Sequence, residues 1–183
     1  APDIKALTIL GKLKERNAHT IFGALVAEIN AIGVGMLDAR AFMDDHLSAE
    51  GVMTRSQPEV KQETIGFGTR MAREIARLDI GQGVVVRKGT VLAVEAFEGT
   101  DDMLRRANKY KTDGLVFVKC ARHDQNPYFD WPVFGDTTLA SMRAAGITTA
   151  VLEADGVVML HKKRLLREAE EAGISLVGFD DNR

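Results

Sequence analysis

Apolar residues with helical spacing alternate with short apolar runs along most of the chain. Between residues 58 and 78 one helical face is formed by Val60, Thr64, Phe67, Met71, Ile75 and Leu78. The residues just before it, Ser56 to Glu59, have the form of a capping box. Gly66 and Gly68 weaken this helix by about 1 kcal/mol each relative to alanine, so we expect close packing against a neighbour.

Apolar runs at 84–87 and 90–95 predict two strands joined by a hairpin turn at Lys88 and Gly89. The near-continuous run 115–119 predicts a central strand. A second hairpin is predicted at Asp155 and Gly156, between the runs 149–152 and 157–160. Helical patterns after Thr100, Asp136 and His161, and a last strand at 174–178, complete an α/β fold with a mixed sheet flanked by helices.

The N-terminal part has a different pattern. Asn17 is placed to cap a helix that Gly33 ends, and a short β run is expected at 34–37. Asp44, Asp45 and His46 follow; three adjacent side chains rarely converge on one metal ion, so we interpret them as a solvated loop. We therefore divide the chain into a helical, linking segment, 1–50, and an α/β domain, 51–183, which the resemblance described below identifies as the catalytic domain.

Composition narrows the classes of function. The 183 residues carry 24 Lys plus Arg and 26 Asp plus Glu, and a net charge of −2 argues against a broad nucleic-acid interface. The single cysteine, Cys120, lies in an apolar run, so we expect a buried, inert thiol. No phosphate-binding loop of the P-loop type and no dinucleotide fingerprint is present.

Three segments carry candidate chemistry. In the first, 79–83, glycines would let a ligand approach the backbone at Gln82 and Gly83, although a simple helix end explains a lone Gly-x-Gly better. In the second, 95–106, a strand ends beside a helix start rich in carboxylates, which suits a phosphate only with a bridging cation such as Mg²⁺. Simple helix capping, with Asp101 and Asp102 paired to Arg105 and Arg106, accounts for the second equally well.

The third segment, 119–135, mixes cations, carboxylates and stiffening prolines. Asp130 stands between aromatic residues and before Pro132, where an extended, rigid backbone would suit a metal ligand or a general base. The alternative is a turn aspartate beside core aromatics. Lys119, Arg122 and His123 add local positive charge.

These segments, taken in order, resemble one bacterial enzyme family. The matching residues are 77–83, 91–96, Glu98 to Asp101, 103–106, and the later pattern Lys119, Gln125, Phe129-Asp130-x-Pro132-x-x-Gly135. The family is that of the UDP-2,3-diacylglucosamine pyrophosphatases of lipid A biosynthesis, the type unrelated to calcineurin-like phosphoesterases. The resemblance is specific from about residue 55 to the end.

The resemblance implies metal-assisted hydrolysis of the pyrophosphate bond of UDP-2,3-diacylglucosamine to UMP and 2,3-diacylglucosamine 1-phosphate. It places the essential aspartate at Asp130, as a catalytic residue and a metal ligand with Glu98 and Asp101. Substrate contacts are then expected from Gln82, Gly83, Thr100, Lys119, Arg122 and Gln125. It further implies a divalent-metal cofactor, a homodimer, peripheral contact with the inner face of the bacterial inner membrane, and no nucleic-acid partner.

Two departures keep a second hypothesis open. Tyr128 stands where family members often have arginine. About the first third of a family chain, a Rossmann-like N-terminal domain, has no counterpart here, which makes a fragment the natural expectation. The alternative is a non-catalytic nucleotide-sugar-binding or dimerisation module of the same fold.

Overall fold

The computed structural model describes residues 3–14, 17–110 and 112–180, which form two compact units. The first unit comprises residues 1–42 and 124–131, and the second comprises 43–123 and 132–183. Asp130 therefore belongs to the first unit, although the chain before residue 124 and after residue 131 belongs to the second. Whether 51–183 is the catalytic domain stays a prediction.

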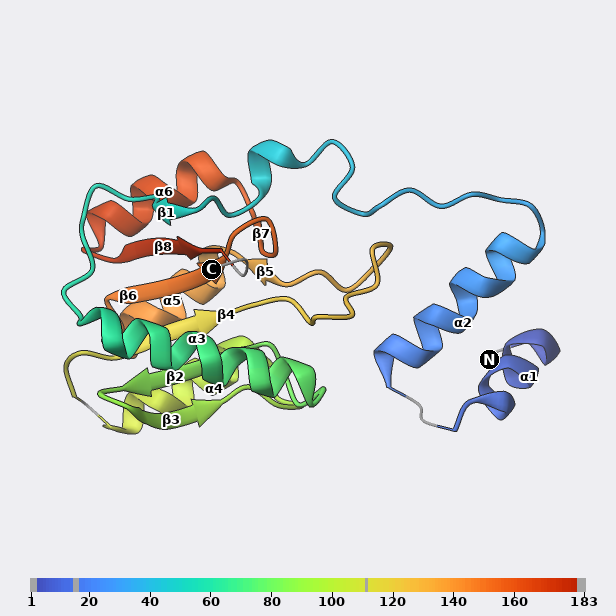
Figure 1. Ribbon diagram of the computed structural model, residues 1–183, viewed down its shortest axis with the longest axis horizontal. Helices are drawn as coiled ribbons and strands as arrows, with labels where there is room; N and C mark the ends of the chain where they lie inside the picture. The colour runs from blue at the N-terminus through green and yellow to red at the C-terminus, as the bar shows by residue number, and fades with distance from the viewer. Residues whose placement is uncertain (1–2, 15–16, 111, 181–183) are drawn as a thin grey trace. The chain divides into compact units, whose positions relative to one another are not determined.

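The second unit is built on a mixed six-stranded sheet in the order β1-β8-β6-β4-β2-β3 (Figure 1). These strands are β1 (Gly51–Val52), β2 (Gly83–Arg87), β3 (Thr90–Val94), β4 (Val116–Lys119), β6 (Thr149–Glu153) and β8 (Ser175–Phe179). Strands β4, β6 and β8 are parallel, whereas β2 is antiparallel to both β3 and β4. The predicted mixed α/β fold is confirmed, as are the central position of β4 and the hairpin at Lys88 and Gly89.

Helices cover both faces of this sheet, because side chains alternate between its faces along each strand. On one face, Phe117 and Leu152 pack against α4 (Thr100–Ala107), α5 (Asp136–Ala144) and α6 (Lys162–Glu171). On the other face, Val116 and Val118 pack against α3 (Gln62–Arg77). Cys120 is buried on the α3 side, as expected.

Three local predictions were wrong. Segment 34–37 forms no strand. Helix α3 begins at Gln62 without a side-chain cap, because the Ser56 carbonyl accepts a hydrogen bond from Ser175 Oγ at 2.8 Å and is held beside β8 instead. Asp155 and Gly156 make no hairpin, since β7 (Val158–Met159) pairs in parallel with β5 (Val133–Phe134) in a separate small sheet.

The first unit packs two helices, α1 (Ile4–Lys12) and α2 (Ala18–Ala31), with the segment 124–131. Asn17 caps α2 as predicted, accepting a hydrogen bond from the Thr20 backbone N–H at 2.9 Å. Short 3₁₀ turns lie elsewhere, η1 (Asp44–His46) and η2 (Asn108–Tyr110). Among the described residues, no helix is both long and apolar enough to cross a bilayer.

Candidate active site

The C-terminal ends of the parallel strands define the edge of the sheet where the candidate chemistry gathers. We call it the carboxyl edge: β4, β6 and β8 end there, as does β3, while β2 begins there. The register sets Gly83 opposite Lys119 across β2 and β4. In open α/β sheets, ligands bind outside this edge, so polar side chains at it are the first candidates for a site.

Lys119, Glu95 and Thr100 form a compact polar cluster at the carboxyl edge. The Lys119 ammonium donates to Thr100 Oγ1 at 2.5 Å and lies 3.5 Å from Glu95 Oε2. The Thr100 hydroxyl donates to Glu95 Oε1 at 2.8 Å. Lys119 ends β4, Glu95 follows β3, and Thr100 is the first residue of α4, so three elements fix the cluster.

Burial of the charged groups in this cluster costs free energy, because they are removed from water. Lys119 is 4% exposed and Glu95 is 9% exposed. A buried charge is stable only when it is paired and hydrogen-bonded, and here each charged group has the other and the Thr100 hydroxyl. Lys119 and Thr100, two predicted substrate contacts, are therefore brought together by a residue that the predicted site did not include. The sequence feature that could have pointed to Glu95 is an acidic residue placed directly after the apolar run 91–94.

Two glycines make room for Glu95. A Cβ atom on Gly81 would meet the Glu95 carbonyl oxygen within about 2 Å, and one on Gly83 would come within overlap distance of Glu95 Oε2 and 3.1 Å from the Phe117 ring. The predicted substrate contact Gly83 thus has a packing reason to be glycine. Beside it, the Gln82 carbonyl accepts a hydrogen bond from the Cys120 N–H at 3.0 Å, which fixes the Gln82 backbone at the carboxyl edge.

Arg122 lies further along the carboxyl edge, three residues beyond Lys119. Its guanidinium forms an ion pair with Asp79, which follows α3 and has a left-handed backbone (φ 56°). The Arg122 side chain is only 14% exposed. The structure thus places this predicted phosphate contact at the expected edge, held by a carboxylate that the predicted site residues did not include.

A second, partly buried carboxylate holds the backbone between Lys119 and Arg122. Glu153 Oε2, at the end of β6, accepts from the Ala121 N–H at 2.6 Å, and Glu153 Oε1 lies 3.0 Å from Arg73 Nη1. Gly156 leaves space for this side chain, because a Cβ there would lie 2.6 Å from the Glu153 carboxyl carbon. Sequence reasoning missed Glu153 because its partners lie far away in the chain and no local motif joins them.

The two predicted metal ligands near α4 have different environments. The pKa of Glu98 lies below its usual range because its carboxylate accepts a hydrogen bond from its own backbone N–H and another from Arg106 at 2.5 Å. Asp101 lies in the first turn of α4, and its Oδ1 atom is buried with no hydrogen-bond partner among the described residues. The predicted pairing of Asp102 with Arg105 is present, whereas Arg106 turns to Glu98 instead.

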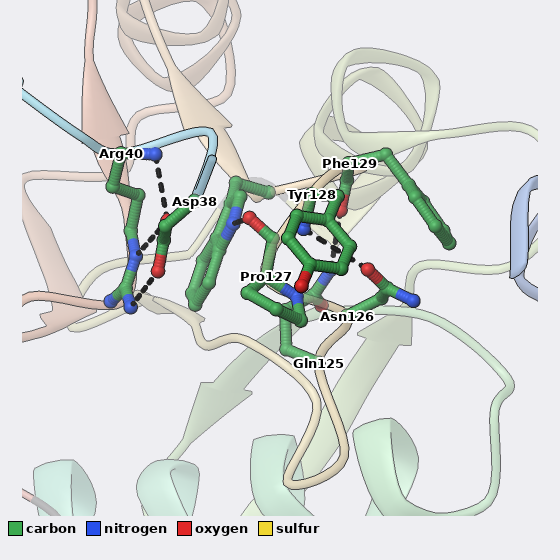
Figure 2. A network of polar contacts seen from close by, with 8 residues as sticks. Asp38, Arg40, Gln125, Asn126, Pro127, Tyr128 and Phe129 are labelled. Carbon is green, nitrogen blue, oxygen red and sulfur yellow. Dashed lines mark hydrogen bonds and ion pairs between the residues drawn. The ribbon is translucent and has the colours of Figure 1, made fainter. Parts of the chain in front are cut away.

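Gln125 and Asp130 lie in the first unit. Figure 2 shows the turned segment from Gln125 to Phe129. The Gln125 amide donates to the carbonyls of Phe129 at 3.0 Å and Asp130 at 3.1 Å, which fixes the turn that presents Asp130. The backbone of Asp130 is left-handed (φ 60°) rather than extended as predicted. Arg40 covers the ring of Trp131, with its guanidinium carbon 3.8 Å from the ring centroid.

The carboxylates do not form a ready-made metal cage. Among the described residues, no three His, Cys, Asp or Glu side chains group closely enough to hold an ion. Of the three predicted ligands, Glu98 is engaged by Arg106, whereas Asp101 has a buried Oδ1 atom with no hydrogen-bond partner among the described residues. The donor set does not fit a metal bound by protein alone.

Comparison with known proteins agrees with the resemblance seen in the residues. Residues 49–177 match the model of the LpxI C-terminal domain. The chain is 29% identical over 191 aligned residues to "UDP-2,3-diacylglucosamine pyrophosphatase LpxI" of Caulobacter vibrioides, and the match covers 98% of this chain and 68% of that relative. Since the family match spans most of the chain, including Glu95, Thr100 and Lys119, the protein belongs to the LpxI C-terminal domain family.

Proposed function

We propose that the protein hydrolyses the pyrophosphate bond of UDP-2,3-diacylglucosamine, releasing UMP and 2,3-diacylglucosamine 1-phosphate in lipid A biosynthesis. The observation that carries the proposal is the family match over residues 49–177, which contains the cluster of Lys119, Glu95 and Thr100. The named activity of the Caulobacter relative supplies the substrate.

The chain's own residues supply positive charge to the diphosphate. Lys119 and Arg122 lie at one edge of the sheet, each held by a carboxylate. Fixed cations in a partly buried site stabilise the charge that grows on phosphate oxygens as the bond breaks. The backbone N–H groups in the first turn of α4 add hydrogen-bond donors for an anion. Asp130 is assigned to activating the water or holding a cation by its position in the family motif.

We also propose that the reaction needs a divalent cation, which arrives with the substrate. Mg²⁺ is commonly bound by one or two carboxylates together with substrate phosphates rather than by a protein cage. This mode suits a chain in which Asp101 offers one free oxygen and no three ligands are grouped among the described residues.

We further propose that the protein acts as a homodimer that contacts the inner face of the bacterial inner membrane. Light scattering, which measures the mass of the particle in solution, tests the dimer.

UMP release from UDP-2,3-diacylglucosamine tests the function. We expect release by the untreated protein, loss after chelation, and recovery when Mg²⁺, Mn²⁺ or Co²⁺ is restored. Full activity after exhaustive chelation would contradict the cation requirement without touching the hydrolase. No UMP under any condition, with thermal stabilisation by UDP-sugars, would instead indicate the non-catalytic binding module.

Asp130→Asn tests the assigned aspartate. Asparagine keeps the left-handed backbone that Asp130 adopts, so the substitution removes the charge and leaves the turn. We expect at least about a 100-fold loss of kcat. Asp155→Asn is the matched control, because Asp155 is exposed and also left-handed (φ 57°), and it should keep full activity. Equal activities of the two variants would remove Asp130 from the reaction.

A further inference from the structure

A basic patch lies at the start of α6, in the second unit. It consists of His46, His161, Lys162, Lys163, Arg164 and Arg167, which line a pocket of about 370 Å³. Asp45 is the one acidic residue in this lining. The protein as a whole carries a net charge of −2, so the patch is a local concentration of positive charge on an otherwise acidic molecule.

Two cations of the patch have no ion-pair partner among the described residues. Lys162 donates to the Leu47 carbonyl at 2.6 Å, and Arg164 forms ion pairs with Asp136 and Glu168. Lys163 and Arg167 are exposed and form no ion pair within the described part of the chain. They stand four residues apart, on the same side of the helix.

This arrangement works against the stability of the helix that carries it. The N-terminal end of a helix favours negative charge, yet the first turn of α6 holds three cations and no acid. Like charges four residues apart repel one another as well. An anion bound above the patch would offset both the unfavourable helix-dipole interaction and the repulsion between the cations. Residues that destabilise the free helix would then stabilise the complex.

The patch shares an edge with the candidate active site. Helix α6 ends at Glu171, shortly before β8 starts, so its beginning lies at the other end of the strands, the carboxyl edge. Leu160, next to the patch, is 48% exposed, and Phe97, between β3 and α4 at the same edge, is fully exposed. Apolar side chains beside cations suit a lipid interface, where both find partners; free phosphate in water would leave the apolar groups unused.

We propose that the basic patch docks the protein on an anionic membrane surface, with the carboxyl edge facing the lipid. The proposal builds on the proposed function, because a substrate with two acyl chains must be met at a bilayer. Charge complementarity commits the patch to phospholipid head groups, and clusters of four Lys or Arg on an amphipathic helix are typical of such contacts.

Vesicle sedimentation of the whole protein, without substrate, tests the docking. We expect binding to vesicles of phosphatidylglycerol and phosphatidylcholine, weak binding to phosphatidylcholine alone, and release at high salt. Lys163→Gln with Arg167→Gln should weaken binding about 25-fold, since each cation near a charged surface contributes about fivefold. Lys61→Gln with Lys109→Gln is the matched control: both residues are exposed, they lie at the opposite edge of the sheet, and their loss should leave binding unchanged.

Three outcomes would overturn the proposal. They are equal sedimentation with charged and neutral vesicles, equal binding by the patch variant and its control, and saturable binding of inorganic phosphate by a protein that ignores vesicles. Phe97→Trp adds a second tryptophan to Trp131, the only natural one. Its emission should shift to shorter wavelength with charged vesicles, and an unchanged spectrum would contradict an edge that faces the lipid.

Activity separates this proposal from the proposed function. UMP release from substrate in charged vesicles should fall in the Lys163→Gln and Arg167→Gln variant, while release from detergent-dispersed substrate should match the unmodified protein. Vesicle binding without any UMP release would sustain the docking surface and reject the hydrolase. UMP release without vesicle binding would sustain the hydrolase and reject the docking surface.

Discussion

The buried ammonium of Lys119 contacts Glu95 and Thr100. Lys119→Met should therefore destabilise the protein by about 3–5 kcal/mol, because it leaves the Glu95 carboxylate buried without its counter-charge. Urea unfolding with a fixed m value measures the loss. Adding Glu95→Gln to the same chain should restore most of the stability, since a neutral amide still accepts from Thr100. A double variant no more stable than Lys119→Met would show that the loss comes from packing rather than charge.

The carboxylate of Glu98 provides a test of the electrostatics near α4. Its pKa is lowered first by its own backbone N–H and then by Arg106. A depressed carboxyl pKa contributes stability above its usual value near 4.5, and that contribution disappears as the pH falls through the lower, folded-state pKa. Arg106→Gln should raise the Glu98 pKa only part of the way, because the backbone hydrogen bond stays. Carbon-detected NMR titration measures it; an unmoved pKa would contradict the ion pair.

At the scale of elements, helix α3 tests why glycine occurs inside a helix. A Cβ on Gly68 would lie 2.7 Å from Val118 and 2.9 Å from Val86, so Gly68→Ala should cost about 1–3 kcal/mol by forcing α3 off the sheet. A Cβ on Gly66 would meet only Arg70, at 3.8 Å, so Gly66→Ala should stabilise by about 1 kcal/mol. Thermal melts of both variants measure the pair. If Gly68→Ala raised the melting temperature and Gly66→Ala lowered it, α3 would have to pack differently on β2 and β4.

The same helix shows which elements could be predicted from the sequence. Apolar spacing located α3, the run 115–119 located the central strand, and the dipeptide at Lys88 located a hairpin, because each signal is local and repeated. The pairing of β5 with β7 could not be predicted, since two-residue strands carry no periodicity and their partners are set by distant chain. Ser56 failed as a cap for a similar reason: Ser175, far along the chain, takes its carbonyl.

The candidate site was predictable in its residue types and only partly in its groupings. Lys119 and Thr100 meet as expected because the strand ends converge at one edge. Glu153 and Arg73 were missed, since a contact between the end of β6 and α3 leaves no mark in either segment. The segment 124–131 packs with α1 and α2 in the first unit, a grouping that motif spacing did not indicate, and its convergence with Lys119 stays a prediction. Tertiary contacts, not motif spacing, decide such cases.

At the scale of the whole molecule, the division into units makes a prediction about residues 1–42. The second unit holds every strand of the six-stranded sheet and both clusters of buried apolar side chains. A chain of residues 43–183 should therefore keep a cooperative melt and a strand signal by circular dichroism. It should lose UMP release, because the segment 124–131 would no longer have the residues that hold it.

Specific contacts explain the expected loss. The Ala39 N–H donates to the Pro127 carbonyl at 2.7 Å, Arg40 lies over the Trp131 ring, and the Phe22 and Phe129 rings are 5.2 Å apart. Deleting residues 1–42 removes all three partners, so Asp130 loses its fixed turn while Lys119 and Arg122 keep their carboxylates in the second unit. Arg40→Ala with Phe22→Ala, in the whole chain, should give a milder version of the same defect. Full UMP release by residues 43–183 would mean that the carboxyl edge works without a positioned Asp130, and the site would then have to be sought in the second unit alone.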